Sequence, residues 1–386
     1  MDRRSASMKG PWEDLEGRIM VAVHLERGYV ADVTVASTRR PELCRALEGM
    51  PVKAVPSMVA LLFHVCSAAQ ECAARIACEQ IAGLPPTAGE QSRRQIRVVL
   101  ETVREHAWAV CIEWPRRLGM APEVEAFAGI RSALRAIDEG LPDWPDKPME
   151  EGTLRALAQA IDRALALEGR VWEGPGALHS WVTAGICPAA HFLQKVRDED
   201  LAEFGRCSLR PVPDMIAWDL DGALAADVDH RFVSRPEWEG DACETGPLVR
   251  MSGHPLVAEL WQRYGNGLLT RLAARLVELV GLPPRLGQLL DGLSGNDGVL
   301  GIGGNGVGLG QVEAARGRLA HRVKVEGDRV SRYQILAPTE WNFHPRGPLW
   351  RGLVGRPAGN ADILRRQVGF LAVALDPCVA FTVQVT

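Results

Sequence analysis

The sequence lacks long apolar runs, an excess of basic residues and any Cys-x-x-Cys pair. Its longest apolar runs, Met58–Phe63 and Phe370–Leu375, are far shorter than the roughly 20 residues that a membrane-spanning helix needs. The net charge is −4 and the pI is about 6.2, whereas a nucleic-acid-binding surface is usually basic. We therefore expect neither a membrane span nor a nucleic-acid partner.

A secretory signal and a disulfide framework are also missing from the pattern. Arg3, Arg4 and Lys9 are not followed by an apolar stretch, so no signal peptide is expected. The nine cysteines are scattered and odd in number, which favours reduced thiols, mostly buried as small hydrophobic side chains. With 47% hydrophobic and 24% charged residues, the composition is that of an ordinary globular protein. These features predict a cytoplasmic protein.

Hydrophobic periodicity predicts a mostly helical α+β fold. Residues 18–36 alternate around Glu26–Gly28 and predict a β-hairpin, and residues 318–336 predict a second hairpin around Glu326–Asp328. Helices are expected at residues 41–47, 57–81, 93–112, 122–137, 149–167, 255–280, in a short segment ending at 293, and at 361–374. The second of these helices is expected to break near Cys66. No repeat or linker is visible, so we expect one large domain over 1–386 with a helical core.

A glycine-rich stretch at residues 295–310 predicts a loop. It contains Gly301-x-Gly303-x-x-Gly306, the spacing of a dinucleotide-binding loop. That fingerprint must follow a strand and open a helix, and neither context is predicted here. A flexible or close-packing glycine loop is the better interpretation.

The end of the chain carries a thiol directly after a proline. Pro377 should end the last helix, and Asp376 before it is biased away from helical geometry, so Cys378 should follow a rigid end. Because residues 375–384 are apolar, we expect them to pack in the interior. The middle, residues 168–253, is rich in Trp, Pro and Gly, reads as irregular and suggests no chemistry.

Several motifs, in order along the chain, resemble a nickel–iron hydrogenase large subunit. The closing third is similar at Val312–Leu319, Tyr333–Asn342 and Asp376-Pro377-Cys378, and the front is similar at Val65–Gln70 and Arg40–Leu43. The resemblance implies a large-subunit-like helical core with peripheral β-hairpins. Its parts would be the hairpin at 18–36, the cysteine-bearing helix at 55–82, the hairpin and pocket segment at 312–342, and the C-terminal helix with its cysteine motif at 360–386.

The departures from that family change the expected chemistry. A catalytic large subunit holds nickel with four thiolates from two Cys-x-x-Cys pairs, but Phe63 and Phe381 stand where two of those cysteines belong. The proton-passing glutamate of the family falls on Leu43, and its histidines fall on Gln70 and Gln384. Two remaining thiolates cannot make the soft four-sulfur nickel site. The resemblance therefore implies no nickel, no hydrogen turnover and no catalytic residue.

The residues that still match the family are those around the iron of such a site. In the family the iron carries two cyanides and one carbon monoxide, and an arginine and a Ser/Thr donate hydrogen bonds to the cyanides. Arg316 and Thr339 match these positions, and Pro338 would form a wall beside them. Cys66 is the expected iron ligand and Cys378 the expected second thiolate. This pattern is similar to hydrogenase expression/formation proteins of the HoxV/HupK type.

The hypothesis is therefore a non-catalytic maturation scaffold that binds the Fe(CN)2(CO) fragment transiently. Its partners would be the small hydrogenase maturation chaperone, the iron-loading partner of that chaperone, and the hydrogenase large subunit. The chaperone could also supply one thiolate to a shared iron.

Other readings of the same residues remain open. The chain could be a cofactor-free mimic of the large subunit that binds chaperones, or a degenerate hydrogenase. A Cys66–His64 nucleophile is disfavoured because adjacent helical side chains do not face each other. The cysteines could be plain core residues, Arg316 an ordinary ion-paired residue and Thr339 a turn residue. No partner can be named for His321 or His344.

Overall fold

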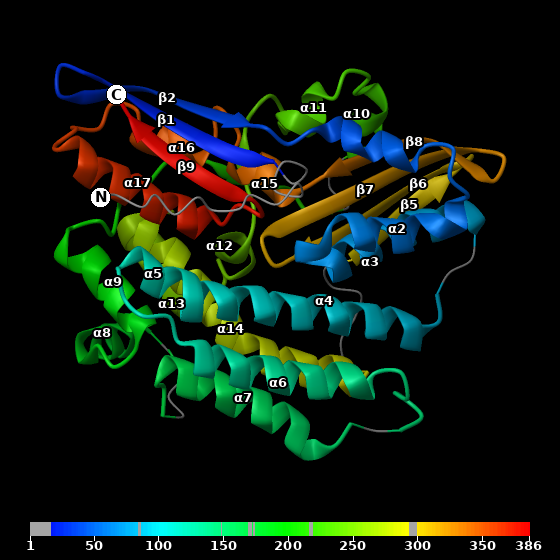
Figure 1. Cartoon of the computed structure of the whole chain (residues 1–386), viewed down its shortest axis with the longest axis horizontal. Coiled ribbons are helices and arrows are strands. Elements are labelled where there is room, and N and C mark those ends of the chain that lie inside the picture. The colour runs from blue at the N-terminus through cyan, green and yellow to red at the C-terminus, as the bar shows by residue number, and fades with distance from the viewer. Residues whose placement is uncertain are drawn as a thin grey trace, which may run out of the picture.

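The computed structural model describes residues 17–83, 86–147, 149–168, 172, 174–215, 219–292 and 299–386. Long helices run along one side of the molecule, and two sets of strands, with shorter helices among them, lie along the other (Figure 1). The predicted mostly helical α+β fold is confirmed. In the described part of the chain, no helix is both long enough and apolar enough to cross a bilayer.

The helical part is built around α14, which is buried along nearly its whole length and packs against α4, α7, α12, α13 and α17. The α-helices are α2 Val55–Leu62, α3 Ser67–Ala82, α4 Ala88–Trp108, α5 Trp114–Arg117, α6 Val124–Gly140, α7 Glu151–Leu165, α8 Pro175–Ala184, α9 Pro188–Asp198, α10 Leu220–Ala226, α11 Arg231–Ser234, α12 Pro247–Arg250, α13 Pro255–Tyr264, α14 Leu268–Leu290, α15 Pro338–Asn342, α16 Pro348–Leu353 and α17 Ala361–Leu375. Shorter helical segments are the 3₁₀ turns η1 Pro41–Leu47, η2 Val52–Ala54 and η3 His64–Cys66 and the π-helical turn η4 Ala109–Glu113.

The two ends of the described chain meet in one sheet. Strands β1 Arg18–Glu26 and β2 Tyr29–Ser37 form the predicted hairpin, and Arg27 and Gly28 make its tight turn with φ of 52° and 80°. Strand β9 Ala380–Val385 pairs with β1 in parallel, giving the order β2-β1-β9. The expectation that the chain end packs in the interior is wrong, because β9 is an edge strand whose side chains alternate between exposed and half-buried.

A four-stranded antiparallel sheet packs its face against α3. It consists of β5 Val299–Gly304, β6 Val307–Ala314, β7 Gly317–Glu326 and β8 Arg329–Leu336, in that order. The predicted second hairpin is β7–β8. A smaller parallel pair is formed by β3 Arg210–Pro211 and β4 Cys243–Glu244.

The predicted glycine loop is wrong over residues 299–304 and 307–310, which lie in strands β5 and β6, while 293–298 lie outside the described residues. Glycine is required here because the backbone of α3 approaches the sheet closely. A Cβ at Gly308 would overlap the carbonyl oxygen of Ala77, and one at Gly310 would overlap that of Ala73. The close-packing interpretation of the glycines is therefore correct, although their secondary structure is not a loop.

Two further helix expectations need correction. The predicted helix at 255–280 is split, because Gly265 adopts a φ of 60° and a Cβ at Gly267 would overlap the backbone of Ala202. α14 then runs through Pro283 and Pro284 to Leu290 without the expected break. The middle region read as irregular contains α8 to α12. By contrast, the break near Cys66 is confirmed, since Phe63 leaves helical geometry between α2 and η3.

Candidate functional site

Cys66 lies where η3 joins α3. The first N–H groups of an α-helix have no partner within the helix. Here Glu101 of α4 accepts two of them: the N–H of Ala68 at 2.8 Å and the N–H of Ala69 at 3.1 Å. This buried carboxylate holds the start of α3 in place, and Cys66 with it.

The Cys66 thiol is surrounded by polar groups that other segments supply. Gln70 Nε2 donates a hydrogen bond to Cys66 Sγ over 3.4 Å. Burial, to which the charges of Glu101 and Cys378 add, raises the pKa of Cys66 to about 12, while Gln70 and Arg316 act in the opposite direction. The two thiols, from opposite ends of the chain, are thus close enough to interact electrostatically.

Cys378 follows the end of α17, where Asp376 adopts a φ of 55° and stops the helix. The Thr339 hydroxyl donates a hydrogen bond to Cys378 Sγ at 3.1 Å, and Cys378 N–H donates to Thr339 Oγ1 at 3.3 Å. Thr339 and Pro338 are buried in the first turn of α15, where Pro338 occupies the N1 position. The structure therefore brings Thr339 and Cys378 together directly.

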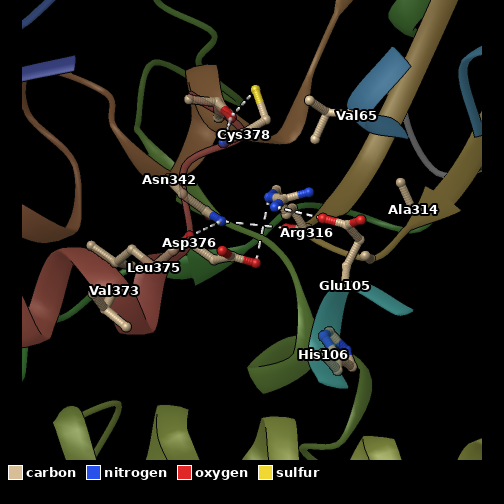
Figure 2. A network of polar contacts seen from close by, with 12 residues as sticks. Val65, Glu105, His106, Ala314, Arg316, Asn342, Val373, Leu375, Asp376 and Cys378 are labelled. Carbon is tan, nitrogen blue, oxygen red and sulfur yellow. Dashed lines mark hydrogen bonds and ion pairs between the residues drawn. The ribbon is translucent and has the colours of Figure 1, made fainter. Parts of the chain in front are cut away.

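Arg316 lies in the turn between β6 and β7, with its guanidinium between two carboxylates (Figure 2). Its Nη2 donates to Glu105 Oε2 at 3.0 Å, and its Nε lies 3.4 Å from Asp376 Oδ2. Asp376 also pairs with Arg275 at 3.4 Å. Burial disfavours the charge on Arg316, but Asp376 and Glu105 outweigh it and raise the pKa of the guanidinium. Arg316 is therefore a largely buried cation held by two carboxylates.

A second arginine holds the backbone of that turn. Arg250 donates to the carbonyl oxygens of Ala314 at 3.1 Å and Ala315 at 2.9 Å, and it forms a bidentate pair with Glu278 of α14. Asn342 Nδ2 lies 3.4 Å from the carbonyl oxygens of both Arg316 and Leu375 (Figure 2). The position of Arg316 is thus set by contacts to α12, α14, α15 and α17.

A third arginine, Arg39, follows strand β2 and interacts electrostatically with both thiols. Its Nη1 donates to Glu340 Oε1 at 2.8 Å. Burial disfavours its charge, yet the negative charges of Cys378, Glu340 and Cys66 raise the pKa of Arg39. Both Arg39 and Arg316 therefore interact electrostatically with both cysteines.

The site opens to the surface through a groove of about 460 Å³. Arg316 and Cys378 line it together with Trp108, Glu113, Arg116, Arg117, Asp376, Pro377, Val379 and Ala380. Cys66 lies outside this lining. A molecule in the groove would therefore have access to both Cys378 and Arg316.

Other sequence candidates lie apart from this arrangement. Phe381 is on β9, with the Arg117 guanidinium 4.5 Å from the centre of its ring. Phe63 is half-buried beside a separate core cluster, and the His64 side chain is outside the described part. His344 is buried, and its Nδ1 accepts the N–H of Arg346. Over the described ranges, no group of three or more His, Cys, Asp and Glu side chains is arranged to hold a metal ion.

Sequence reasoning missed the residues that hold the site in place. Glu101, Glu105, Arg39 and Arg250 carried no motif that would single them out. Asp376 was visible in the Asp-Pro-Cys motif but was read only as a helix stop. His321, for which no partner was predicted, is fully buried and contacts Gln70 and Tyr333.

Comparisons with known proteins agree with this geometry at the level of family and fold. Residues 302–383 match the family model for nickel-dependent hydrogenase. The chain is 30% identical to the hydrogenase expression/formation protein HupK of Rhizobium leguminosarum bv. viciae, over 96% of each chain. It is 32% identical to the hydrogenase expression/formation protein HoxV of Cupriavidus necator, over 89% of this chain and 91% of that protein.

The three-dimensional comparison shows the fold alone. The reduced Ni-Fe-Se hydrogenase of D. vulgaris Hildenborough superimposes with a TM-score of 0.61, covering 92% of this chain and 94% of that chain at 16% sequence identity. The predicted large-subunit-like fold is confirmed.

Proposed function

The chain belongs to the family of hydrogenase expression/formation proteins that includes HupK and HoxV, and from that premise we propose that it is a non-catalytic maturation scaffold for nickel–iron hydrogenase. In this role it binds the Fe(CN)2(CO) fragment as cargo, holds it transiently and passes it to the hydrogenase large subunit.

The observation that carries this proposal is that two largely buried guanidinium groups, those of Arg39 and Arg316, interact electrostatically with two thiols from opposite ends of the chain. An iron atom that bears two cyanides and two thiolates is anionic, and anions in a dry site need charged donors. Arg39 and Arg316 interact electrostatically with both Cys66 and Cys378, so the positive charge lies where such a fragment would bring negative charge.

The number of protein ligands also suits this cargo. The fragment brings its own cyanides and carbonyl, so Cys66 and Cys378 suffice to hold it. Thr339 contacts Cys378 through its hydroxyl, and that hydroxyl would donate to a cyanide after rotating about its Cα–Cβ bond. Pro338 would form the apolar wall beside it.

The open groove beside Cys378 supports transient binding. A resident cofactor is normally enclosed, whereas Cys378 and Arg316 are reached from the surface. We infer that the fragment arrives from the small maturation chaperone and its iron-loading partner in the cytoplasm and leaves by the same face. Cys66 would be the first ligand, because it matches a position that binds iron in the nickel–iron hydrogenase family, and Cys378 would be the second.

Infrared spectroscopy tests the proposal most directly. The protein is purified without air from cells that contain the hydrogenase maturation machinery. Cyanide and carbonyl stretching bands, together with iron and without nickel, would support the scaffold. Absence of these bands would overturn cargo binding and leave the alternative, a cofactor-free mimic that binds chaperones. Hydrogen uptake by the isolated chain would overturn the non-catalytic role.

Cysteine variants assign the ligands. Cys66→Ala and Cys378→Ala should each lower bound iron, and Cys72→Ala is the matched control because Cys72 is a buried thiol further along α3. If both site variants retain the iron content of the control, the assigned ligands are wrong.

A further inference from the structure

A chain of buried hydrogen bonds runs from the four-stranded sheet to the Cys66 thiol. Tyr333 Oη on β8 lies 2.7 Å from His321 Nδ1 on β7, and His321 Nε2 lies 2.8 Å from Gln70 Oε1 on α3. Gln70 Nε2 then lies 3.4 Å from Cys66 Sγ. Gln70, His321 and Tyr333 are each at most 2% exposed, so water does not compete for these contacts.

The donors in this chain can be assigned from the chemistry of the groups. A glutamine oxygen only accepts hydrogen bonds, so His321 must carry its proton on Nε2. A neutral imidazole then has a bare Nδ1, which accepts the Tyr333 O–H. Burial keeps the ring neutral, because it lowers the pKa of His321 to about 3. Every donor therefore points toward Cys66.

The reverse arrangement would leave a buried donor without a partner. If the Gln70 amide were turned over, His321 would donate from Nδ1 to Tyr333, and the Tyr333 O–H would need another acceptor. Among the described residues, His321 is the hydrogen-bond partner of Tyr333 Oη. Leaving a buried hydroxyl hydrogen unpaired is unfavourable, so Tyr333 selects one orientation of the whole chain.

We propose that Tyr333, His321 and Gln70 are positioning residues that fix the Gln70 amide so that its N–H donates to the Cys66 sulfur. This inference rests on the proposed function only for its purpose, which is to support Cys66 as an iron ligand. A donor aimed at the sulfur occupies one side of it and so fixes the direction from which the cargo binds. The amide of Gln70 thus donates to the sulfur in an orientation that Tyr333 sets through His321.

The first test uses metal-free protein, so it does not depend on cargo binding. The S–H stretching band of Cys66 is isolated as the Raman difference between the parent and Cys66→Ala. We expect the S–H frequency of a thiol whose sulfur accepts a hydrogen bond from Gln70 and whose hydrogen is not donated to Gln70. A band at the lower frequency of a donating thiol would mean that the amide has the opposite orientation, and it would overturn the proposal.

The second test measures alkylation of Cys66 by iodoacetamide at one fixed pH, followed by peptide mass spectrometry. Gln70→Met keeps the side-chain length but removes the donor, and we expect Cys66 to react about fivefold more slowly, since only the thiolate reacts. Tyr333→Phe removes a single hydroxyl, and we expect about a twofold decrease with the Raman band shifted toward the donating position.

Cys72 on α3 provides the control in the same samples. If a substitution merely loosened α3, the alkylation of the buried Cys72 would rise along with any change at Cys66. A slower Cys66 with an unchanged Cys72 supports the proposal. Equal Cys66 rates in the parent and both variants would overturn it, and this result would not affect the infrared test of the proposed function.

Discussion

Thr339 and Cys378 exchange hydrogen bonds: the hydroxyl donates to the sulfur at 3.1 Å, and the Cys378 N–H donates to the same hydroxyl oxygen at 3.3 Å. One side chain on α15 thereby fixes both the backbone and the thiol of the residue that follows α17. Thr339 is 2% exposed, so its hydroxyl is shielded from water on the protein side, while Cys378 borders the groove.

Thr339→Val should therefore weaken the site and the fold together. The variant keeps the shape of the side chain but removes the hydroxyl, leaving the Cys378 N–H without its partner. We expect the free energy of unfolding to fall by about 1–2 kcal/mol, measured by urea denaturation, and bound iron to fall as well. Thr339→Ser is the control, because it retains the hydroxyl and should retain iron. Full iron content in Thr339→Val would exclude a role for the hydroxyl in binding.

Removing the cation at Arg316 should be costly because its partners are buried. In Arg316→Met, Glu105 and Asp376 each lose a partner while their side chains are only 10% and 9% exposed. Arg104 and Arg275 remain as partial compensation. We expect a loss of about 2–4 kcal/mol in the free energy of unfolding.

The comparison for Arg316 is an exposed pair on α17. Arg365 pairs with Asp362 at 2.6 Å, but the two side chains are 46% and 81% exposed. Arg365→Met should change the stability by less than about 0.5 kcal/mol. Equal losses in the two variants would show that the Arg316 network does not stabilise the fold.

Glu101 should make the stability depend on pH near neutrality. Burial raises the pKa of its carboxyl from 4.5 to about 7. The hydrogen bonds from the N–H groups of Ala68 and Ala69 lower the pKa but do not cancel the effect of burial. Between these two pH values the folded protein binds more protons than the unfolded chain. The contribution of Glu101 therefore decreases as the pH rises from 4.5 to 7, by on the order of 3 kcal/mol at most.

Urea denaturation of the parent and Glu101→Gln across that pH range measures this effect. The glutamine cannot ionise, so the parent should lose stability relative to the variant as the pH rises toward 7. Glu125→Gln, at an exposed position on α6, is the control and should follow the parent at every pH. Parallel curves for the parent and Glu101→Gln would contradict the raised pKa.

Local signals in the sequence predicted much of the fold. The turn at Arg27-Gly28, the break at Phe63 and the helix stop at Asp376 are each encoded within a few residues, and all three are observed. The site candidates Arg316, Thr339 and Cys378 were named from their motifs, and the structure places them within one network. Their role in holding the cargo stays a prediction.

Long-range contacts could not be read from the sequence. Glu101 and Glu105 lie on α4 like any other helical glutamate. Their role in the site depends on segments elsewhere in the chain that pack against them. Strand β9 was missed because its partner β1 lies at the other end of the chain. The strands at 299–310 were missed because glycine disfavours β-structure locally, and the approach of α3 that requires glycine appears only in three dimensions.

That approach of α3 gives the last prediction. Gly308→Ala places a methyl group against the carbonyl oxygen of Ala77, and neither backbone can move without disturbing the packing of α3 on the sheet. We expect a loss of about 1–3 kcal/mol in the free energy of unfolding.

Gly304→Ala is the matched control in the same hairpin, because nothing lies within 4 Å of its added methyl group. It should change the stability by no more than about 0.5 kcal/mol. Since Cys66 directly precedes α3, Gly308→Ala should also lower bound iron. Similar iron content and stability in both variants would show that the glycines do not set the position of the helix.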